Sequence, residues 1–150
     1  MRAINEIIIH CTATAEGRDV TVDELRAWHK QRGFKDIGYH YVVTLDGDIV
    51  NGRPITMCGA HCQGHNANSI GIAYVGGLDA CGKPADTRTE AQREALKVAV
   101  RVLRDAFGNV PVHGHNEYAN KACPCFDVTA EFGCKTQRAQ RTKQDTEDGG

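Results

Sequence analysis

Two short apolar runs place the strongest constraint on how this chain can fold. INEIIIH, at residues 4–10, and SIGIAYV, at residues 69–75, are rich in β-branched and other apolar residues. Each run has the length of a strand, and its composition is typical of a strand in the interior of a sheet. The first run ends at His10, and the second is stopped by a pair of glycines. The two runs therefore predict two inner strands.

A capping box marks the start of a first helix. Thr21 and Glu24 have the required spacing, and Val22, Leu25 and Trp28 follow at helical intervals. The sequence predicts a helix over about residues 22–32, because a glycine follows at position 33.

A second capping box predicts a longer helix. Thr89 and Gln92 form the box, and the pattern continues to about residue 107, where Gly108 stops it. Apolar residues at helical spacing are expected to face inward, and they are Ala95, Ala99, Val102, Leu103 and Phe107. Asp127 can cap a short third helix that ends at Gly133.

A hairpin and a short strand complete the expected architecture. Asp46-Gly47 separates strand-like residues 39–45 from residues 48–51, which is a strong hairpin signal. Residues 110–113 predict another short strand. The alternation of strands and helices favours an α/β fold, a mixed central sheet with helices on its faces, in a single domain over residues 1–134. Residues 135–150 are almost entirely polar and are expected to form a disordered tail.

Charge and hydropathy exclude several classes of function. The formal net charge is −1 and the pI is near 6.6, so there is no basic field for nucleic acid. The apolar runs are too short to span a membrane, and the N-terminus reads as a strand instead of a signal peptide. We expect a cytoplasmic protein as made. Its seven cysteines are then expected to be reduced thiols, of which one or more bind metal.

The segment HGHNEYANKACPCF, at residues 113–126, concentrates ligand chemistry. A catalytic zinc takes three protein ligands and keeps one position open. Two neutral imidazoles and one thiolate leave net positive charge on the metal, which activates water. His10 can supply one imidazole, and this segment can supply the rest. The spacing leaves open the choice between His113 and His115, and Pro124 only hints at Cys123 over Cys125.

A rival site lies in CGAHCQGH, at residues 58–65. Cys58, His61, Cys62 and His65 could form a structural zinc knuckle, although the spacing matches no common zinc finger.

Longer motifs carry a resemblance to a known family. The motifs are IIIHCTAT at 7–14, ELRAWHKQRGFKDIGYHYVVTLDGDIVNGR at 24–53, GAHCQGHNANSIGIAYVGG at 59–77 and HNEYANKACPCFDV at 115–128. The chain closely resembles the N-acetylmuramoyl-L-alanine amidases of type 2, a family of zinc amidases related to peptidoglycan-recognition proteins. The likeness is greatest to the phage amidase lysozymes.

The resemblance implies a set of site residues. The metal ligands would be His10, His115 and Cys123, because the family's second histidine lies eight residues before its ligand cysteine. Tyr39 and Lys121 would be catalytic. The groove that binds substrate would include His61, Asn66 and Asn68.

The resemblance also implies the reaction. One Zn²⁺ per chain would serve hydrolysis of the amide between N-acetylmuramic acid and L-alanine in bacterial peptidoglycan. The chain would be a phage-type endolysin, expected to be a monomer, that acts on the cell wall after release. A recycling amidase that acts on anhydro-muropeptides and a non-catalytic peptidoglycan-binding module remain as alternatives.

Overall fold

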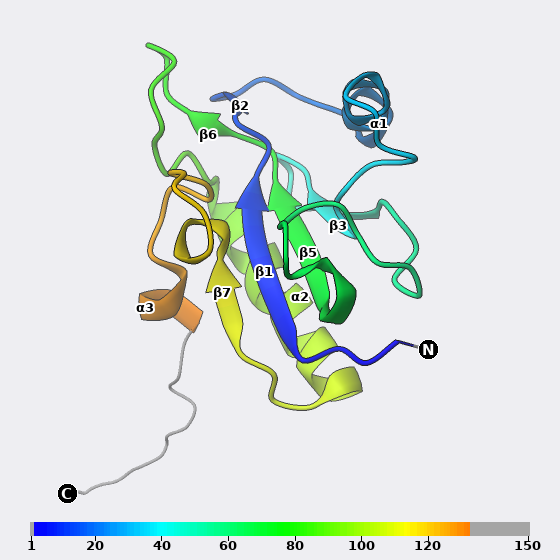
Figure 1. The fold of residues 1–150 in the computed structure, drawn as a ribbon. Coiled ribbons are helices and arrows are strands. Elements are labelled where there is room, and N and C mark those ends of the chain that lie inside the picture. Colours follow the sequence, from blue (N-terminus) through cyan, green and yellow to red (C-terminus); the bar gives the residue numbers. More distant parts are fainter. Residues whose placement is uncertain (1, 133–150) are drawn as a thin grey trace, which may run out of the picture.

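A five-stranded mixed sheet forms the centre of the computed structural model, which describes residues 2–132 (Figure 1). The strands lie in the order β4-β3-β5-β1-β7. Their bounds are β1 Glu6–Cys11, β3 Tyr41–Val43, β4 Ile49–Asn51, β5 Ser69–Tyr74 and β7 Val112–Gly114. All neighbours are parallel except β3 and β4, which form the expected hairpin. A second, two-stranded sheet pairs β2 (Thr14–Ala15) with β6 (Gly77–Leu78).

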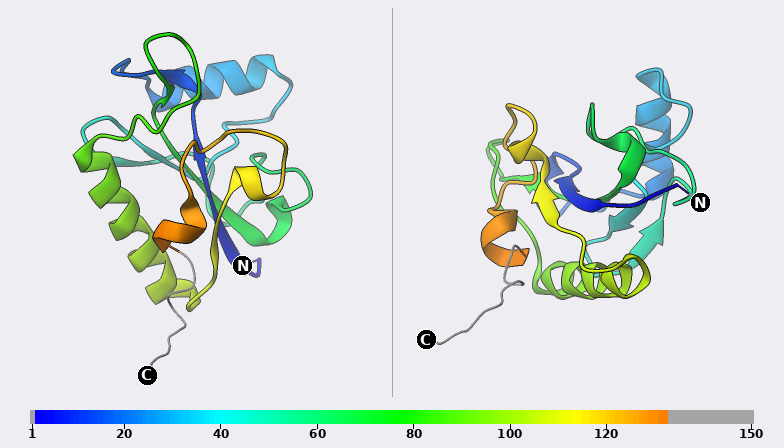
Figure 2. Two further views of the ribbon diagram at one scale, coloured as in Figure 1. Left: turned by 90° about the vertical axis from the view of Figure 1, so that its left-hand side faces the viewer. Right: turned by 60° about the horizontal axis from the view of Figure 1, so that its bottom comes forward.

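The helices cover the two faces of the central sheet. Helix α2 (Glu90–Phe107) runs along one face, and α1 (Val22–Gln31) lies on the other side, as the two views of Figure 2 show. Both predicted capping boxes are present. Helix α3 (Val128–Phe132) packs beside β7, and Asp127 accepts a hydrogen bond from the backbone N–H of Ala130 at 3.1 Å. The predicted α/β fold class is confirmed.

The alternation of side chains along β1 separates the core from the site. Ile7, Ile9 and Cys11 join the main hydrophobic cluster, together with α2. Because successive residues of a strand point to opposite faces, Ile8 and His10 point away from α2. The face of the sheet opposite α2 therefore carries His10 at the carboxyl end of β1.

One residue of the predicted core was assigned wrongly. Val102 is 56% exposed, whereas Leu96 and Val100 are buried. With about 100° per residue, the buried stripe of α2 is centred near Leu96, Ala99 and Leu103, and Val102 lies roughly a quarter turn away. The periodicity alone did not locate the centre of the stripe.

Two further expectations fall at the ends of the chain. The predicted disordered tail at residues 135–150 and the end of the third helix at Gly133 lie outside the described residues. Within residues 2–132, none of the helices combines the length and the apolar character that crossing a bilayer requires.

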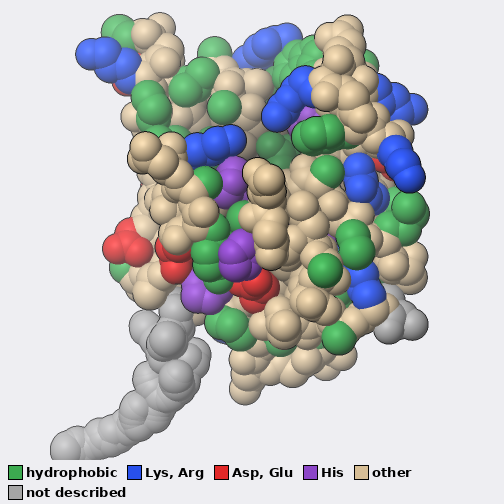
Figure 3. All heavy atoms as spheres, in the orientation of Figure 1, with side chains coloured by type: hydrophobic (Ala, Val, Ile, Leu, Met, Phe, Trp, Pro, Cys, Tyr) green, Lys and Arg blue, Asp and Glu red, His purple; other side chains and the backbone are tan. Residues whose placement is uncertain are grey.

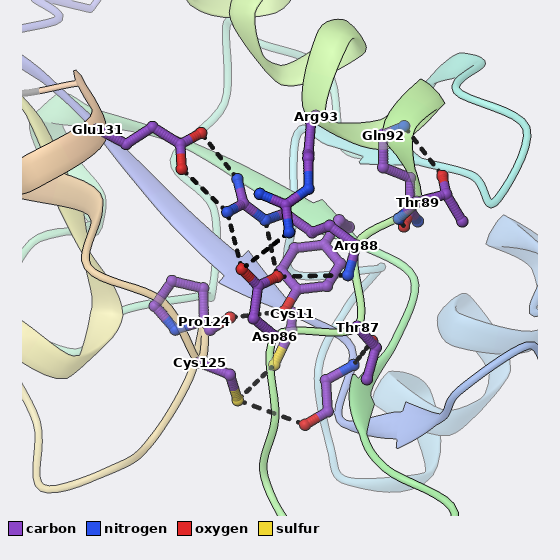
Figure 4. Close-up of polar contacts among 12 residues, drawn as sticks. Cys11, Asp86, Thr87, Arg88, Thr89, Gln92, Arg93, Pro124, Cys125 and Glu131 are labelled. Atoms are coloured by element: carbon purple, nitrogen blue, oxygen red, sulfur yellow. Dashed lines mark hydrogen bonds and ion pairs between the residues drawn. The ribbon is translucent and has the colours of Figure 1, made fainter.

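A buried cation joins α3 to the loop before α2 (Figure 4). The side chain of Arg88 is 1% exposed and pairs with Asp86 at 2.9 Å and with Glu131 at 2.8 Å. Its guanidinium carbon also lies 3.4 Å from the ring centroid of Phe126. The guanidinium donates hydrogen bonds to both carboxylates, and the aromatic ring packs against it. The two carboxylates and the ring together stabilise the buried positive charge.

We expect Arg88→Ala to lower the free energy of unfolding by about 3 kcal/mol, because it leaves two carboxylates without their buried partner. Urea denaturation of variants with the same metal content measures this change. Arg93→Ala is the matched control, since Arg93 is 41% exposed and reaches Asp86 at 3.5 Å. That control should cost less than about 1 kcal/mol. Equal losses for the two variants would contradict the assignment of Arg88 as a buried structural cation.

Candidate metal centre and active site

Three side chains with metal-binding atoms meet at the carboxyl end of β1. One ligand atom each from His10, His115 and Cys123 lies within 4.8 Å of the others. The imidazole centroids of His10 and His115 are 4.6 Å apart. The Sγ of Cys123 lies 3.9 Å from Nδ1 of His10. This is the one such group of His, Cys, Asp or Glu side chains in the part of the chain that the structure describes.

Strand register explains why His115 lies beside His10. In the parallel pair of β1 and β7, His113 lies opposite Ile8, and Gly114 lies opposite Ile9. The next residue, His115, therefore emerges level with His10 at the end of the sheet. His113 lies two residues earlier, opposite Ile8 and away from His10. Its Nδ1 lies 2.8 Å from a carboxylate oxygen of Glu117.

The thiol of Cys123 lies in surroundings that favour its anionic form. The backbone N–H of Cys11 donates to its sulfur at 3.2 Å. Hydrogen bonding from Cys11 lowers the pKa of the Cys123 thiol, although partial burial opposes this effect. The thiol of Cys125 points elsewhere and lies 3.4 Å from the carbonyl oxygen of Gly77. Burial raises the pKa of Cys125 to about 12. Cys123 is thus the better thiolate ligand of the two.

The donor set fits a tetrahedral zinc ion with one open position. Zinc bonds of about 2.3 Å to sulfur and about 2.0–2.1 Å to nitrogen place the two ligand atoms about 3.5 Å apart. The 3.9 Å between Cys123 Sγ and His10 Nδ1 is close to that separation. Burial lowers the pKa of His10 well below its ordinary value, with further contributions from His61, His115 and Lys121. Burial and Lys121 also lower the pKa of His115. Both imidazoles are therefore neutral donors at neutral pH.

A cleft of about 710 Å³ opens in front of these residues. Tyr39 and Lys121 line it together with the three candidate ligands. The ring of Tyr39 lies 5.3 Å from that of His10. Burial raises the pKa of the Tyr39 hydroxyl, with additional contributions from Cys123 and Cys11, so the hydroxyl stays a proton donor at neutral pH. Lys121 is exposed, and within residues 2–132 it forms no ion pair with a carboxylate.

The cleft has a positive character. Arg32, at the end of α1, lines it together with Lys121, and none of the described residues that line it is acidic. Figure 3 shows histidine side chains gathered on this face, and the acidic side chains lie mainly in its lower half. The sequence did not single out Arg32, Phe34, Gln63 or Tyr118 as cleft residues. Arg32 and Phe34 lie in a segment without a metal-binding motif, whereas Gln63 and Tyr118 lie within the two ligand-rich segments but are not themselves metal-binding residue types.

The three residues expected to bind substrate differ in position. His61 lines the cleft but is only 7% exposed, and its Nδ1 lies 2.8 Å from Nε2 of His10. Asn66 also lines the cleft, and its side-chain oxygen accepts the backbone N–H groups of His61 and Cys62 at 2.9 Å. Asn68 is not among the cleft residues, and its side chain donates to the carbonyl of Ala3 at 2.8 Å.

The rival zinc knuckle at residues 58–65 does not form. His65 stacks on Tyr118 with ring centroids 3.7 Å apart, and its Nδ1 lies 3.1 Å from Glu6. Cys58 is exposed, whereas Cys62 is buried. In the described chain, these side chains form no group of metal-binding atoms.

Comparison with known proteins identifies the family to which this chain belongs. The family model for N-acetylmuramoyl-L-alanine amidase matches residues 1–126. The chain belongs to the N-acetylmuramoyl-L-alanine amidase family. The activity expected from the motifs, hydrolysis of the amide between N-acetylmuramic acid and L-alanine in peptidoglycan, is therefore confirmed.

Individual relatives of this amidase are phage, bacterial and animal proteins. The endolysin of Klebsiella phage KP32 is 40% identical over 124 residues, which cover 83% of this chain and 82% of the endolysin. A peptidoglycan-recognition protein of Drosophila melanogaster is 34% identical, over 88% of this chain and 74% of that protein. The structure of the N-acetylmuramoyl-L-alanine amidase LysC from Clostridium intestinale matches with a TM-score of 0.73 and 28% identity, over 87% and 85% of the two chains.

The geometry separates the two members of each candidate pair. We expect His115→Ala and Cys123→Ser to lose bound zinc, because each removes a donor atom from the group at His10. His113→Ala and Cys125→Ser should keep zinc at the wild-type level. Metal analysis of the purified variants after dialysis measures the difference. Since all four changes lie in one short segment, a general folding defect cannot produce this contrast. Zinc loss in Cys125→Ser with retention in Cys123→Ser would reverse the assignment.

Proposed function

We propose that this amidase holds one catalytic zinc ion through His10, His115 and Cys123. The observation that supports the proposal is the convergence of three neutral or anionic donor atoms at the inner end of the cleft. Such a zinc ion supplies Lewis-acid chemistry, which makes water nucleophilic near neutral pH and polarises the scissile carbonyl. Two neutral imidazoles and one thiolate leave net positive charge for this task.

Lys121 and Tyr39 are the groups that act on the substrate. The Lys121 ammonium extends into the cleft from the segment before Cys123, so it stabilises the negative charge that develops on the carbonyl oxygen. Tyr39 also lines the cleft, with its ring 5.3 Å from that of His10, and its hydroxyl donates a hydrogen bond to the water or the oxyanion. An ammonium and a phenolic hydroxyl are both hydrogen-bond donors, which suits them to a developing oxyanion.

The substrate is the peptidoglycan of a bacterial cell wall, and the chain acts on it as an endolysin. The support is the similarity to phage endolysins over more than four fifths of both chains. Asn66 and Arg32 line the same cleft and contribute to the binding of the glycopeptide. The chain works as a monomer and reaches the wall after release from the cytoplasm in which it is made.

Metal dependence tests the proposed centre. A strong chelator should abolish release of soluble fragments from purified sacculi, and about one equivalent of zinc should restore it, since the site holds one ion. The measurement combines turbidity loss of sacculi with metal analysis of the same samples. Full activity in protein shown to be free of metal would end the proposal.

Substitutions at Lys121 and Tyr39 test the catalytic roles. Lys121→Ala and Tyr39→Phe should each lower kcat by roughly 10²-fold, because each removes one donor to the transition state. Zinc content should stay near that of the wild type, since neither side chain supplies a ligand atom to the group. Wild-type turnover in either variant would remove that residue from the mechanism. Loss of zinc would instead indicate a structural role at the centre.

A further inference from the structure

The imidazole of His61 lies behind the metal centre, where it meets the edge of His10. The two rings are nearly perpendicular, with an interplanar angle of 89° and centroids 4.9 Å apart. Nδ1 of His61 lies 2.8 Å from Nε2 of His10, and Nε2 of His61 lies 3.2 Å from the hydroxyl of Ser69. Both of these hydrogen bonds are buried.

We propose that His61 is a positioning residue for the metal centre, and that it acts by accepting the Nε2 proton of His10. This acceptance leaves the Nδ1 lone pair of His10 free and directs it at the metal. The inference rests on the proposed zinc centre, and it assigns His61 a role other than contact with substrate.

The number of ring protons on the two histidines supports donation from His10 to His61. Each neutral imidazole carries a single N–H, so the short contact between His10 and His61 uses one donor and one acceptor. Nδ1 of His10 lies 3.9 Å from Cys123 Sγ and would be the atom that holds the metal, and a metal ligand atom cannot carry a proton. The proton of His10 therefore lies on Nε2 and is donated to His61. The proton of His61 then lies on its own Nε2 and is donated to the oxygen of Ser69.

The opposite tautomer would close the metal site. If His61 donated its Nδ1 proton, Nε2 of His10 would be the acceptor, and the proton of His10 would lie on Nδ1. The metal would then face an N–H group instead of a lone pair. Only one direction of the hydrogen bond between the two histidines is therefore compatible with metal binding by His10.

The surrounding backbone holds the ring of His61 in a narrow slot. A Cβ added at Gly71 would lie 2.6 Å from the His61 ring, and one added at Gly59 would lie 2.7 Å from it. Gly71 belongs to β5 and lies opposite Ile8 of β1, so the ring rests on the sheet beside the strand that carries His10. Asn66 fixes the backbone of His61 by accepting its N–H at 2.9 Å. The ring therefore has little freedom to turn away from His10.

A neutral partner has a chemical consequence for the metal. Metal-bound histidines often donate to carboxylates, which increase the electron density on the ligand. A neutral imidazole orients His10 without adding a negative charge near the centre. The centre then keeps the net positive charge of a site with two imidazoles and one thiolate, which favours the activation of water.

Zinc affinity separates positioning from substrate contact. The dissociation constant of zinc should rise by about 10–100-fold in His61→Ala, because the orienting acceptor is lost. His61→Asn should stay within a few-fold of the wild type, since its side-chain oxygen can take the place of Nδ1. His65→Ala is the matched control, because it removes a histidine of the same loop that pairs with Glu6, and it should leave zinc affinity unchanged. Competition with a chromophoric chelator measures all four proteins.

The alternative roles give different results. If His61 only contacts substrate, His61→Ala binds zinc as tightly as the wild type, and KM alone rises, which would overturn the proposal. If the zinc centre itself is misassigned, Cys123→Ser also keeps wild-type zinc affinity, which marks failure of the proposed function. Circular dichroism confirms that each variant is folded.

A measurement on the wild-type protein does not depend on any variant. Long-range ¹H–¹⁵N spectra of the zinc-loaded enzyme report which ring nitrogen carries each proton. We expect the protons of His10 and of His61 on Nε2. A proton on Nδ1 of either residue would refute the direction of donation.

Discussion

The parallel pairing of β1 with β5 and β7 is the constraint on which the site depends. In a parallel sheet, the carboxyl ends of neighbouring strands meet at one edge. His10 is the last residue of β1 whose side chain points away from α2, and the pairing of Ile9 with Gly114 brings His115 level with it. On the other side, Gly71 of β5 lies opposite Ile8 and leaves the space that the ring of His61 occupies. A slip of one residue in either pairing would turn these side chains to the face covered by α2.

Cys123 reaches the same point from a loop, so its position depends on contacts outside the sheet. The backbone N–H of Cys11 holds its sulfur, and the hydroxyl of Tyr74 donates to the carbonyl of Pro124 at 2.6 Å. Further along the segment, the buried guanidinium of Arg88 lies on the ring of Phe126. Figure 4 shows the ion pairs of Arg88 and the contacts of Pro124 and Cys125, which lie next in sequence to this candidate ligand, so the stability of the fold and the placement of Cys123 are linked.

Burial divides the site into a rigid back and an accessible front. His10 and Ser69 are completely or almost completely buried, and His61 is 7% exposed between them. Tyr39 is half-buried, and Lys121 is exposed at the cleft. Groups that orient ligands are therefore held by packing, whereas the groups proposed to act on the substrate face the space that it enters. This division is what a catalytic centre needs, because ligand geometry must persist while substrates exchange.

Most helices and strands of this protein, and the candidates for its site, could be predicted from local sequence signals. Strand composition, capping boxes and the Asp46-Gly47 turn are local signals, and the elements that they predict are present within one or two residues at most ends. The family motifs also indicated His10, His115 and Cys123, whose role as zinc ligands stays a prediction. The residues alone, however, did not choose between His113 and His115, nor locate the buried stripe that excludes Val102.

The contacts between the candidate groups could not be predicted from the sequence, because they depend on how distant segments pack together. His61 was expected in the substrate groove, and its hydrogen bond to His10 depends on strand pairing and on the packing of a loop 51 residues away in sequence. The burial of Arg88 between Asp86 and Glu131 likewise joins segments 43 residues apart. Periodicity and capping act over a few residues, so they contain no information about such distances. Strand register and side-chain packing set these long-range contacts, because the contacts form only when the strands and helices assemble.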